Sequence, residues 1–240
     1  MNKSVAFLEL KYGNIYGGYP NFYAISEIAL LVFEYDANKI FLESWTNNAS
    51  VDIVSVTSKT NELGHTLGRV KEVINMKAKR RRPYDENFKM GEEELKMEFA
   101  KLRPSKMPIR NFLLKNFNKY RFRDIVVFDG RRDVFLCERS GANFSRYNII
   151  DLQKELNKET EYLFSLNKLS VVINFELDQS YIRSNNLEYW LHPIAARQIV
   201  PKSAAFDAVR LMMVHNEHKL HRSDFLIKAQ LVLNKIQHTK

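Results

Sequence analysis

The sequence predicts an α/β protein with a mixed β-sheet flanked by helices. Two observations predict this class. The first part of the chain contains apolar runs joined by short turns, and no convincing helix precedes residue 62. From about residue 124 onward, strand-like and helix-like segments alternate, which is the order typical of a sheet with helices packed on its faces. Hydrophobic residues make up 45% of the 240 residues, so the chain is able to bury a core.

Three strands are expected at the start of the chain. Residues 5–10 are rich in apolar side chains and end at the turn signal Tyr12-Gly13-Asn14. Residues 24–35 are nearly all apolar and predict a buried strand, and residues 40–45 return as its hairpin partner. Residues 51–56 extend this sheet or cap it.

The middle of the chain predicts helices. Apolar residues at positions 63, 67, 70, 73 and 74 share one helical face and predict a helix over residues 62–74. A helix over residues 92–102 has three glutamates in its first turn, where negative charge complements the helix dipole. Another helix is expected over residues 109–117. Residues 76–90 have few apolar side chains and look like an exposed loop or insertion.

Strands and helices alternate in the second half. Strands are expected at residues 124–128 and 147–150, and Asp151 follows the second strand as the N-cap of a helix. Further helices are expected over residues 187–197, 203–214 and 225–236.

This order predicts one domain over residues 1–220, with a basic insertion around residues 76–106. Residues 221–240 then form a C-terminal helical extension. Its amphipathic helix serves docking or self-association, or else it completes the core.

The charge distribution indicates a polyanion partner. The formal net charge is +9, and residues 69–132 alone carry a net of +10. A concentrated positive field attracts nucleic acid first, and anionic membrane or acidic protein second. Alternatively, this positive charge belongs to a solvated surface that only keeps the protein soluble. The residues predicted to grip the phosphate backbone are Lys77, Lys79, Arg80, Arg81, Arg82, Arg121, Arg123, Arg131 and Arg132.

Aromatic side chains are interleaved with this positive charge. Residues 101–132 hold 10 basic and 2 acidic side chains together with Phe112, Phe117, Tyr120 and Phe122. Exposed rings stack on bases, whereas buried rings belong to the core. We favour burial for Phe112 and Phe117 and leave both interpretations open for Tyr120 and Phe122.

The composition also limits the compartment. No apolar run approaches the roughly 20 residues that a membrane span needs, and the first ten residues do not resemble a signal peptide. Cys137 is the single cysteine, which favours a reducing, intracellular compartment, the cytoplasm. No zinc-binding or nucleotide-binding motif is present.

Three local stretches together resemble the DEDD (DnaQ-like) family of 3′–5′ exonucleases, which have a ribonuclease-H-like fold. The first is residues 7–13, followed on the next strand by Ile-Ser-Glu-Ile-Ala at residues 25–29. The second is Val-Val-Phe-Asp-Gly-Arg-Arg-Asp at residues 126–133, and the third is Lys-Ser-Ala-Ala-Phe-Asp-Ala at residues 202–208. With the spacing between them they cover roughly residues 5–215.

The resemblance implies a site that holds two divalent ions on four carboxylates, beside a histidine. Carried over residue by residue, the first two acidic positions fall on Leu8 and Leu10, the third on Asp133 and the last on Asp207. The histidine position falls on Lys202. The site is therefore expected to be degenerate, with Asp133 and Asp207 as metal ligands and Mg²⁺ or Mn²⁺ as cofactor only if the protein is active.

A shift of one residue in the first strand offers Glu9 in place of the leucines. Successive side chains of a strand point to opposite faces, so Glu9 lies on the other face from Leu8 and Leu10.

The leading hypothesis is a protein that binds single-stranded DNA or RNA and no longer cleaves it. One alternative is an active, metal-dependent 3′–5′ exonuclease that uses Asp133 and Asp207 with Glu9 or Glu27. Another is an interaction module of a larger assembly, in which the basic patch contacts an acidic protein.

Overall fold

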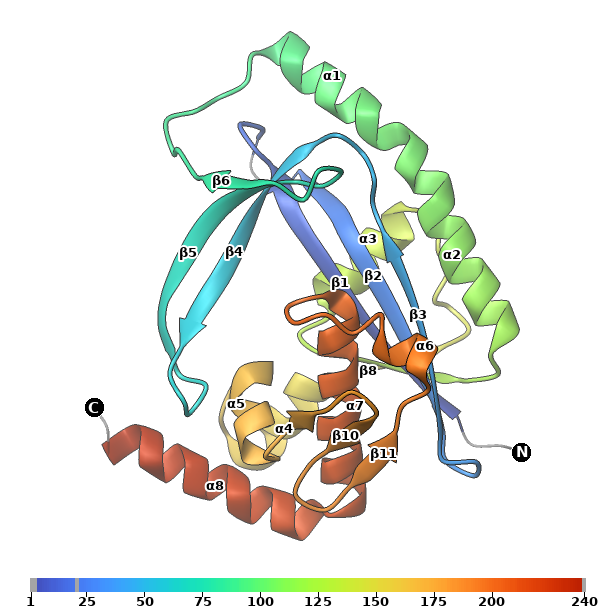
Figure 1. Cartoon of the computed structure of the whole chain (residues 1–240), viewed down its shortest axis with the longest axis vertical. Coiled ribbons are helices and arrows are strands. Elements are labelled where there is room, and N and C mark those ends of the chain that lie inside the picture. The colour runs from blue at the N-terminus through green and yellow to red at the C-terminus, as the bar shows by residue number, and fades with distance from the viewer. Residues whose placement is uncertain (1–3, 20–21, 239–240) are drawn as a thin grey trace.

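The computed structural model describes residues 4–19 and 22–238, and its main element is a mixed sheet (Figure 1). Its first three strands are antiparallel neighbours: β1 (Ser4–Ile15), β2 (Tyr23–Glu34) and β3 (Lys39–Thr46). On the other edge of β1 lie β7 (Asp124–Val127) and β8 (Asn148–Asp151), both parallel to β1. The strand order β3-β2-β1-β7-β8 confirms the predicted mixed α/β class.

A second group of strands joins the sheet at the C-terminal end of β1. It consists of β4 (Asp52–Thr60), β5 (Thr66–Asn75) and β6 (Arg81–Pro83), all antiparallel neighbours. The outer edge of β1 pairs with β7 at residues 5–7 and with β4 only at residues 14–15. Along residues 8–13 no strand of the described chain pairs with this edge. The sheet therefore has a gap there, and β4 and β5 curl away from it (Figure 1).

Helices cover both faces of the sheet. One face packs on α2 (Lys106–Lys119) and α3 (Arg131–Arg139), and α1 (Glu92–Leu102) continues this side beyond the 3₁₀ turn η1 (Arg103–Ser105). The other face packs on α4 (Leu152–Thr160), α5 (Leu166–Val172), α7 (Ala204–Leu220) and α8 (Arg222–His238). A small sheet of β9 (Glu176–Leu177), β10 (Tyr181–Arg183) and β11 (Glu188–Trp190) and the short helix α6 (Pro193–Ala196) complete this side.

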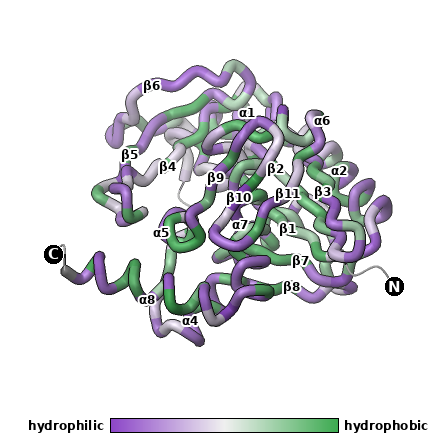
Figure 2. The backbone as a smooth tube through the Cα atoms, turned by 60° about the horizontal axis from the view of Figure 1, so that its bottom comes forward, coloured by the Kyte–Doolittle hydropathy of each residue, from purple (hydrophilic) through white to green (hydrophobic). Residues whose placement is uncertain are grey.

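The side chains of β1 alternate between the two faces. Phe7 packs in the core on the α7 side, whereas Leu8 and Leu10 pack in the core on the α2 and α3 side. Figure 2 shows the hydrophobic residues concentrated in the central elements and a hydrophilic stretch around β6. In the part of the chain that the structure describes, no helix is both long and apolar enough to cross a membrane.

Two expected helices are wrong. Residues 62–74 were expected to be helical, but β5 pairs with β4 along its length, and Leu67 is 70% exposed while Val73 is fully buried. The β-branched residues of this segment favour a strand, and the pairing with β4 satisfies its backbone. Residues 187–197 form β11 and the four-residue α6, because Pro193 begins a helix at its first turn.

The turn expected at Tyr12-Gly13-Asn14 is also wrong, since β1 runs through these residues. A Cβ on Gly13 would lie 2.3 Å from the carbonyl oxygen of Val54. Gly13 therefore permits β4 to approach β1 closely. In the sequence, a glycine with this role looks the same as a glycine in a turn.

The C-terminal helix α8 lies at one end of the molecule (Figure 1). Phe225, Ala229 and Leu233 contribute to the core, while Ile227 and Leu231 are exposed. Docking or self-association through this helix stays a prediction, as do the domain boundaries, whose outermost residues 1–3 and 239–240 lie outside the described residues.

Candidate functional site

Glu9 lies in the middle of β1 at the gap in the sheet. Its side chain is only 8% exposed, and its Oε1 atom has no hydrogen-bond partner among the described residues. Burial raises the pKa of Glu9 well above its usual value, and the negative charges of Asp133 and Asp207 raise it further, against the opposing effect of Lys11 and Arg210. Five charged side chains from β1, α3 and α7 therefore meet at one place, which we call the carboxylate cluster.

Asp133 belongs to the first turn of α3 and is 6% exposed. Its carboxylate accepts a hydrogen bond from the backbone N–H of Leu10, at the part of β1 whose outer edge has no strand partner. Burial raises the pKa of Asp133 to about 7, although this hydrogen bond and the nearby Lys11 act in the opposite direction. The gap in the sheet thus provides a backbone donor for the carboxylate.

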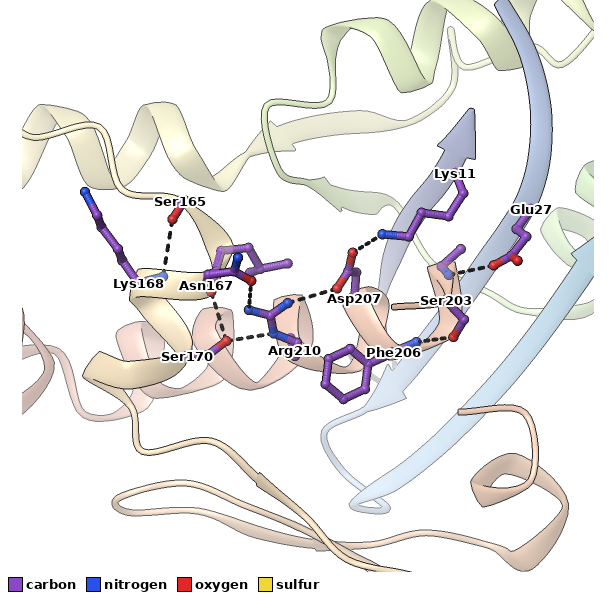
Figure 3. Close-up of polar contacts among 12 residues, drawn as sticks. Lys11, Glu27, Ser165, Asn167, Lys168, Ser170, Ser203, Phe206, Asp207 and Arg210 are labelled. Atoms are coloured by element: carbon purple, nitrogen blue, oxygen red, sulfur yellow. Dashed lines mark hydrogen bonds and ion pairs between the residues drawn. The ribbon is translucent and has the colours of Figure 1, made fainter. Parts of the chain in front are cut away.

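Asp207 belongs to the first turn of α7 and contacts both cations of the cluster (Figure 3). The Nζ of Lys11 donates to its Oδ2, and the Nη1 of Arg210 donates to its Oδ1 at 3.0 Å. Arg210 is 8% exposed and is held in place by the Oγ of Ser170 and the Oδ1 of Asn167, each at 2.7 Å. Two cations therefore neutralise the charge of Asp207.

The N-terminus of α7 has a carboxylate partner of its own. The Oε2 of Glu27 accepts the backbone N–H of Ala204 at 3.0 Å, and the Oγ of Ser203 accepts that of Phe206 at 3.1 Å. Negative charge at this end complements the helix dipole. Lys79 approaches Glu27 with its Nζ 4.0 Å from Oε1. These contacts explain why Glu27, an acidic residue, lies within the otherwise apolar strand β2.

The residues of β1 that lie in the carboxylate cluster are not the two leucines named in the sequence analysis. Leu8 and Leu10 are core residues on the face that packs against α2 and α3. Glu9 and Lys11 are the strand residues that lie with Asp133 and Asp207. Three carboxylates and two cations therefore meet in the carboxylate cluster, and β1 contributes Glu9 and Lys11 to it.

A groove of about 530 Å³ opens next to the carboxylate cluster, between β4 and α7. We call it the polar groove. Hydroxyl side chains of β4 line it together with the carboxylates of Glu27 and Asp207. Five cations also line it, from β1, the β5–β6 region and the start of α7: Lys11, Lys79, Arg81, Lys202 and Arg210. The groove is therefore lined by more positive than negative side chains.

The predicted cations of the β5–β6 region differ in their surroundings. Lys77, Lys79 and Arg80 are exposed in the turn between the two strands. Arg81 forms an ion pair with Glu72 at 2.9 Å, and Arg82 forms one with Asp52 at 2.7 Å. Part of the positive charge of Arg81 and Arg82 is therefore neutralised within the protein.

The remaining predicted cations lie at the two ends of β7. Arg121 and Arg123 are exposed shortly before its start, whereas Arg131 and Arg132 begin α3 after its end. Only the second pair is next in sequence to Asp133. Among the interleaved rings, Phe117 and Phe122 are buried, and the Tyr120 hydroxyl donates to the Oε1 of Glu43 at 2.9 Å.

Lys202 is exposed and lines the polar groove immediately before the first turn of α7, with a left-handed backbone (φ 70°). It therefore lies in the same groove as Asp207, while Asp133 lies across the carboxylate cluster. The sequence reasoning missed Arg210, although its position three residues after Asp207 places both on one helical face. It also assigned no role to Lys11, although alternation in a strand places Lys11 on the face of Glu9.

In this arrangement the residues do not fit a site for two divalent ions. The two-ion site that the resemblance implies has four carboxylates as hard oxygen ligands, whereas here only three meet, and the ammonium of Lys11 contacts one of them, Asp207. Within residues 4–19 and 22–238, no group of three or more His, Cys, Asp or Glu side chains is arranged to hold a metal ion.

No family model matches the sequence, and no curated protein matches it. Among solved structures, the chain is similar to one described as the crystal structure of a full-length 3′-exonuclease, with 12% sequence identity and a TM-score of 0.40. The match covers 92% of this chain and 61% of that chain, so this chain spans about three fifths of that structure's length. At this TM-score the similarity carries no weight for the function.

Proposed function

We propose that this protein binds single-stranded nucleic acid in the polar groove, on a ribonuclease-H-like fold, without cleaving it. The observation that carries the proposal is the convergence of five cations from separate parts of the chain on one groove, beside carboxylates that two of these cations neutralise. Phosphate groups are the ligands that such a set of cations and hydroxyls favours.

The strand arrangement supports the fold. Among β3, β2, β1, β7 and β8 only β2 runs opposite to the others, as is typical of a ribonuclease-H-like sheet. Helices pack on both faces of these strands. The group β4, β5 and β6 is an addition to that arrangement, and it forms one wall of the polar groove.

The cations of the polar groove have unequal freedom to bind phosphate. Lys202 is exposed, and the Lys79 side chain is 49% exposed with its Nζ 4.0 Å from Glu27. Lys11 and Arg210 are already bound to Asp207. We therefore assign the backbone contacts chiefly to Lys79 and Lys202.

The carboxylate cluster supports binding without cleavage. A divalent ion needs a negative local field. Lys11 and Arg210 add positive charge at Asp207. This positive charge disfavours a divalent cation at this place.

Metal-dependent cleavage is the second candidate, and one observation favours it. The buried Oε1 atom of Glu9 has no partner among the described residues and lies beside two further carboxylates. Buried polar groups without a partner concentrate at functional sites. This candidate requires Lys11 to leave Asp207.

The salt dependence of binding tests the proposal. We expect the affinity for a single-stranded oligonucleotide to fall as salt rises. The double variant Lys79→Gln/Lys202→Gln should reduce the slope of log K against log[salt] by about 1.4 in magnitude, because each lost phosphate contact removes about 0.7. Fluorescence anisotropy at several salt concentrations measures both quantities.

The matched control is Lys39→Gln/Lys158→Gln, which removes two exposed lysines outside the polar groove. It should leave the slope unchanged. An affinity of the wild-type protein that does not depend on salt would contradict the proposal. Equal changes of slope in both double variants would move the contacts away from the polar groove.

A further inference from the structure

A second groove, of about 880 Å³, adjoins the polar groove at Lys11, Tyr12 and Val56, which line both. We call it the aromatic groove. It is lined by the rings of Tyr12, Tyr19, Tyr23, Tyr84 and Phe88 and by the cations Lys11, Lys71, Lys89 and Arg132. Glu86 is the one acidic residue among the lining residues. The aromatic groove is thus lined by both aromatic rings and positively charged side chains.

One wall of the aromatic groove is formed by β1, β2 and the start of α3. The rings of Tyr12 and Tyr23 meet edge to face, with centroids 5.5 Å apart. The guanidinium of Arg132 lies 4.7 Å from the centre of the Tyr23 ring, and its hydrogen bond to the Tyr12 side chain lowers the pKa of Tyr12 against the larger effect of burial. These contacts hold the two rings and a cation in a fixed relation.

The opposite wall is formed by the segment after β6. The Phe88 ring stacks on the buried Tyr16 ring with centroids 4.6 Å apart and an interplanar angle of 13°, and remains 40% exposed. Tyr84 meets Tyr16 edge to face at 5.9 Å, and the Nζ of Lys71 lies 5.0 Å from the centre of the Tyr84 ring. Tyr16 therefore supports both rings from behind.

Gly17 lies where the segment after β6 contacts the turn after β1. Gly17 has a left-handed backbone (φ 74°), and a Cβ there would lie 2.6 Å from the Phe88 ring. The backbone N–H of Met90 donates to the carbonyl of Gly17 at 2.9 Å and ties the segment to the turn after β1. The exposed ring of Phe88 is therefore positioned by backbone contacts and by Tyr16.

We propose that the aromatic groove binds the unpaired bases of the same nucleic-acid strand whose phosphates lie in the polar groove. This inference rests on the proposed function. Rings with an open side stack on bases of any sequence, whereas the base faces of a duplex are covered by their neighbours. The two grooves meet at Lys11 and Tyr12, in the gap between β7 and β4. The ligand class is therefore a single strand with exposed bases.

Comparing two oligomers of equal length and charge tests the inference. One is oligothymidylate, and the other carries abasic sites along its whole length. We expect Phe88→Leu and Tyr19→Ala each to weaken thymidylate binding about 5- to 150-fold and to leave abasic binding unchanged. Phe88→Leu keeps an apolar contact on Tyr16, and Phe135→Ala, which removes a 53% exposed ring outside the groove, is the control that should change neither affinity.

The outcomes separate the inference from the proposed function. Thymidylate affinity that stays within twofold in both groove variants would overturn the inference and leave the proposed function intact. An equal loss for both oligomers would overturn it as well, because it shows that the rings do not contact bases. Failure of the wild-type protein to bind either oligomer at low salt, or tighter binding of an acidic peptide than of thymidylate, would overturn the proposed function itself.

Discussion

Glu9 has the least favourable surroundings of the three carboxylates. Lys11 and Arg210 both contact Asp207, and a backbone N–H contacts Asp133, whereas Oε1 of Glu9 has no partner among the described residues. A buried carboxylate without a partner destabilises the folded state. The burial of Glu9 in the carboxylate cluster therefore lowers the stability of the folded protein.

We expect Glu9→Gln to stabilise the protein by about 1–3 kcal/mol at neutral pH, since an amide carries no charge that burial penalises. The folded pKa of Glu9 is raised above its usual 4.5. Between 4.5 and that raised value the folded state binds the extra proton, so stability falls as the pH rises through this window. The gain from Gln is therefore small near pH 4.5 and grows toward pH 8. Denaturant unfolding across this pH range measures it.

Asp207→Asn is the comparison, because it leaves Lys11 and Arg210 without their shared carboxylate. It should destabilise the protein at neutral pH by about 1–3 kcal/mol. If both variants change the free energy of unfolding in the same direction, the described distribution of charge is wrong.

The sequence could predict part of this cluster. Asp133 and Asp207 were named through the family resemblance, and both lie in the cluster. The pairing of Glu9 with Lys11 follows from alternation once the strand is known, but the register does not, because apolar residues at positions 7, 8 and 10 bury on either face of a sheet that is covered by helices on both sides.

At the scale of elements, β1 determines where the grooves lie. Its outer edge pairs first with β7 and then with β4, and the gap between them admits Asp133 to the Leu10 N–H and joins the two grooves. Local patterns predicted β2, β3 and the helix of residues 92–102. They could not predict β5 or the gap, because these depend on pairing between segments that are distant in sequence.

Gly13→Ala tests this role of β1. The added Cβ would meet the Val54 carbonyl oxygen at 2.3 Å, so β4 must move away from β1. We expect a loss of about 1–3 kcal/mol in the free energy of unfolding, and weaker oligonucleotide binding because both grooves are lined by β4. Thermal denaturation and anisotropy measure the two effects.

Gly68→Ala on β5 is the matched control, since its Cβ would meet nothing within 4 Å. It should leave the melting temperature unchanged or raise it slightly. Similar melting temperatures for the two variants would contradict the close approach of β1 and β4.

At the scale of the whole molecule, the surplus of positive charge is predictable from the sequence, but its place is not. Residues 69–132 carry the net +10 and contribute Lys79 and Arg81 to the polar groove. The other three cations, Lys11, Lys202 and Arg210, come from segments nearly 200 residues apart. Only the fold brings them to one surface, which is why the composition indicated a polyanion partner without indicating a site.

Degradation of 5′-labelled single-stranded DNA and RNA, with Mg²⁺ or Mn²⁺, tests binding without cleavage most directly. The wild-type protein is compared with the Asp133→Asn/Asp207→Asn variant, and binding is measured in parallel. We expect both oligomers to remain intact while the wild-type protein binds them with an affinity that falls as salt rises. Metal-dependent shortening from the 3′ end that disappears in the double variant would contradict the proposal and show that the carboxylate cluster is catalytic.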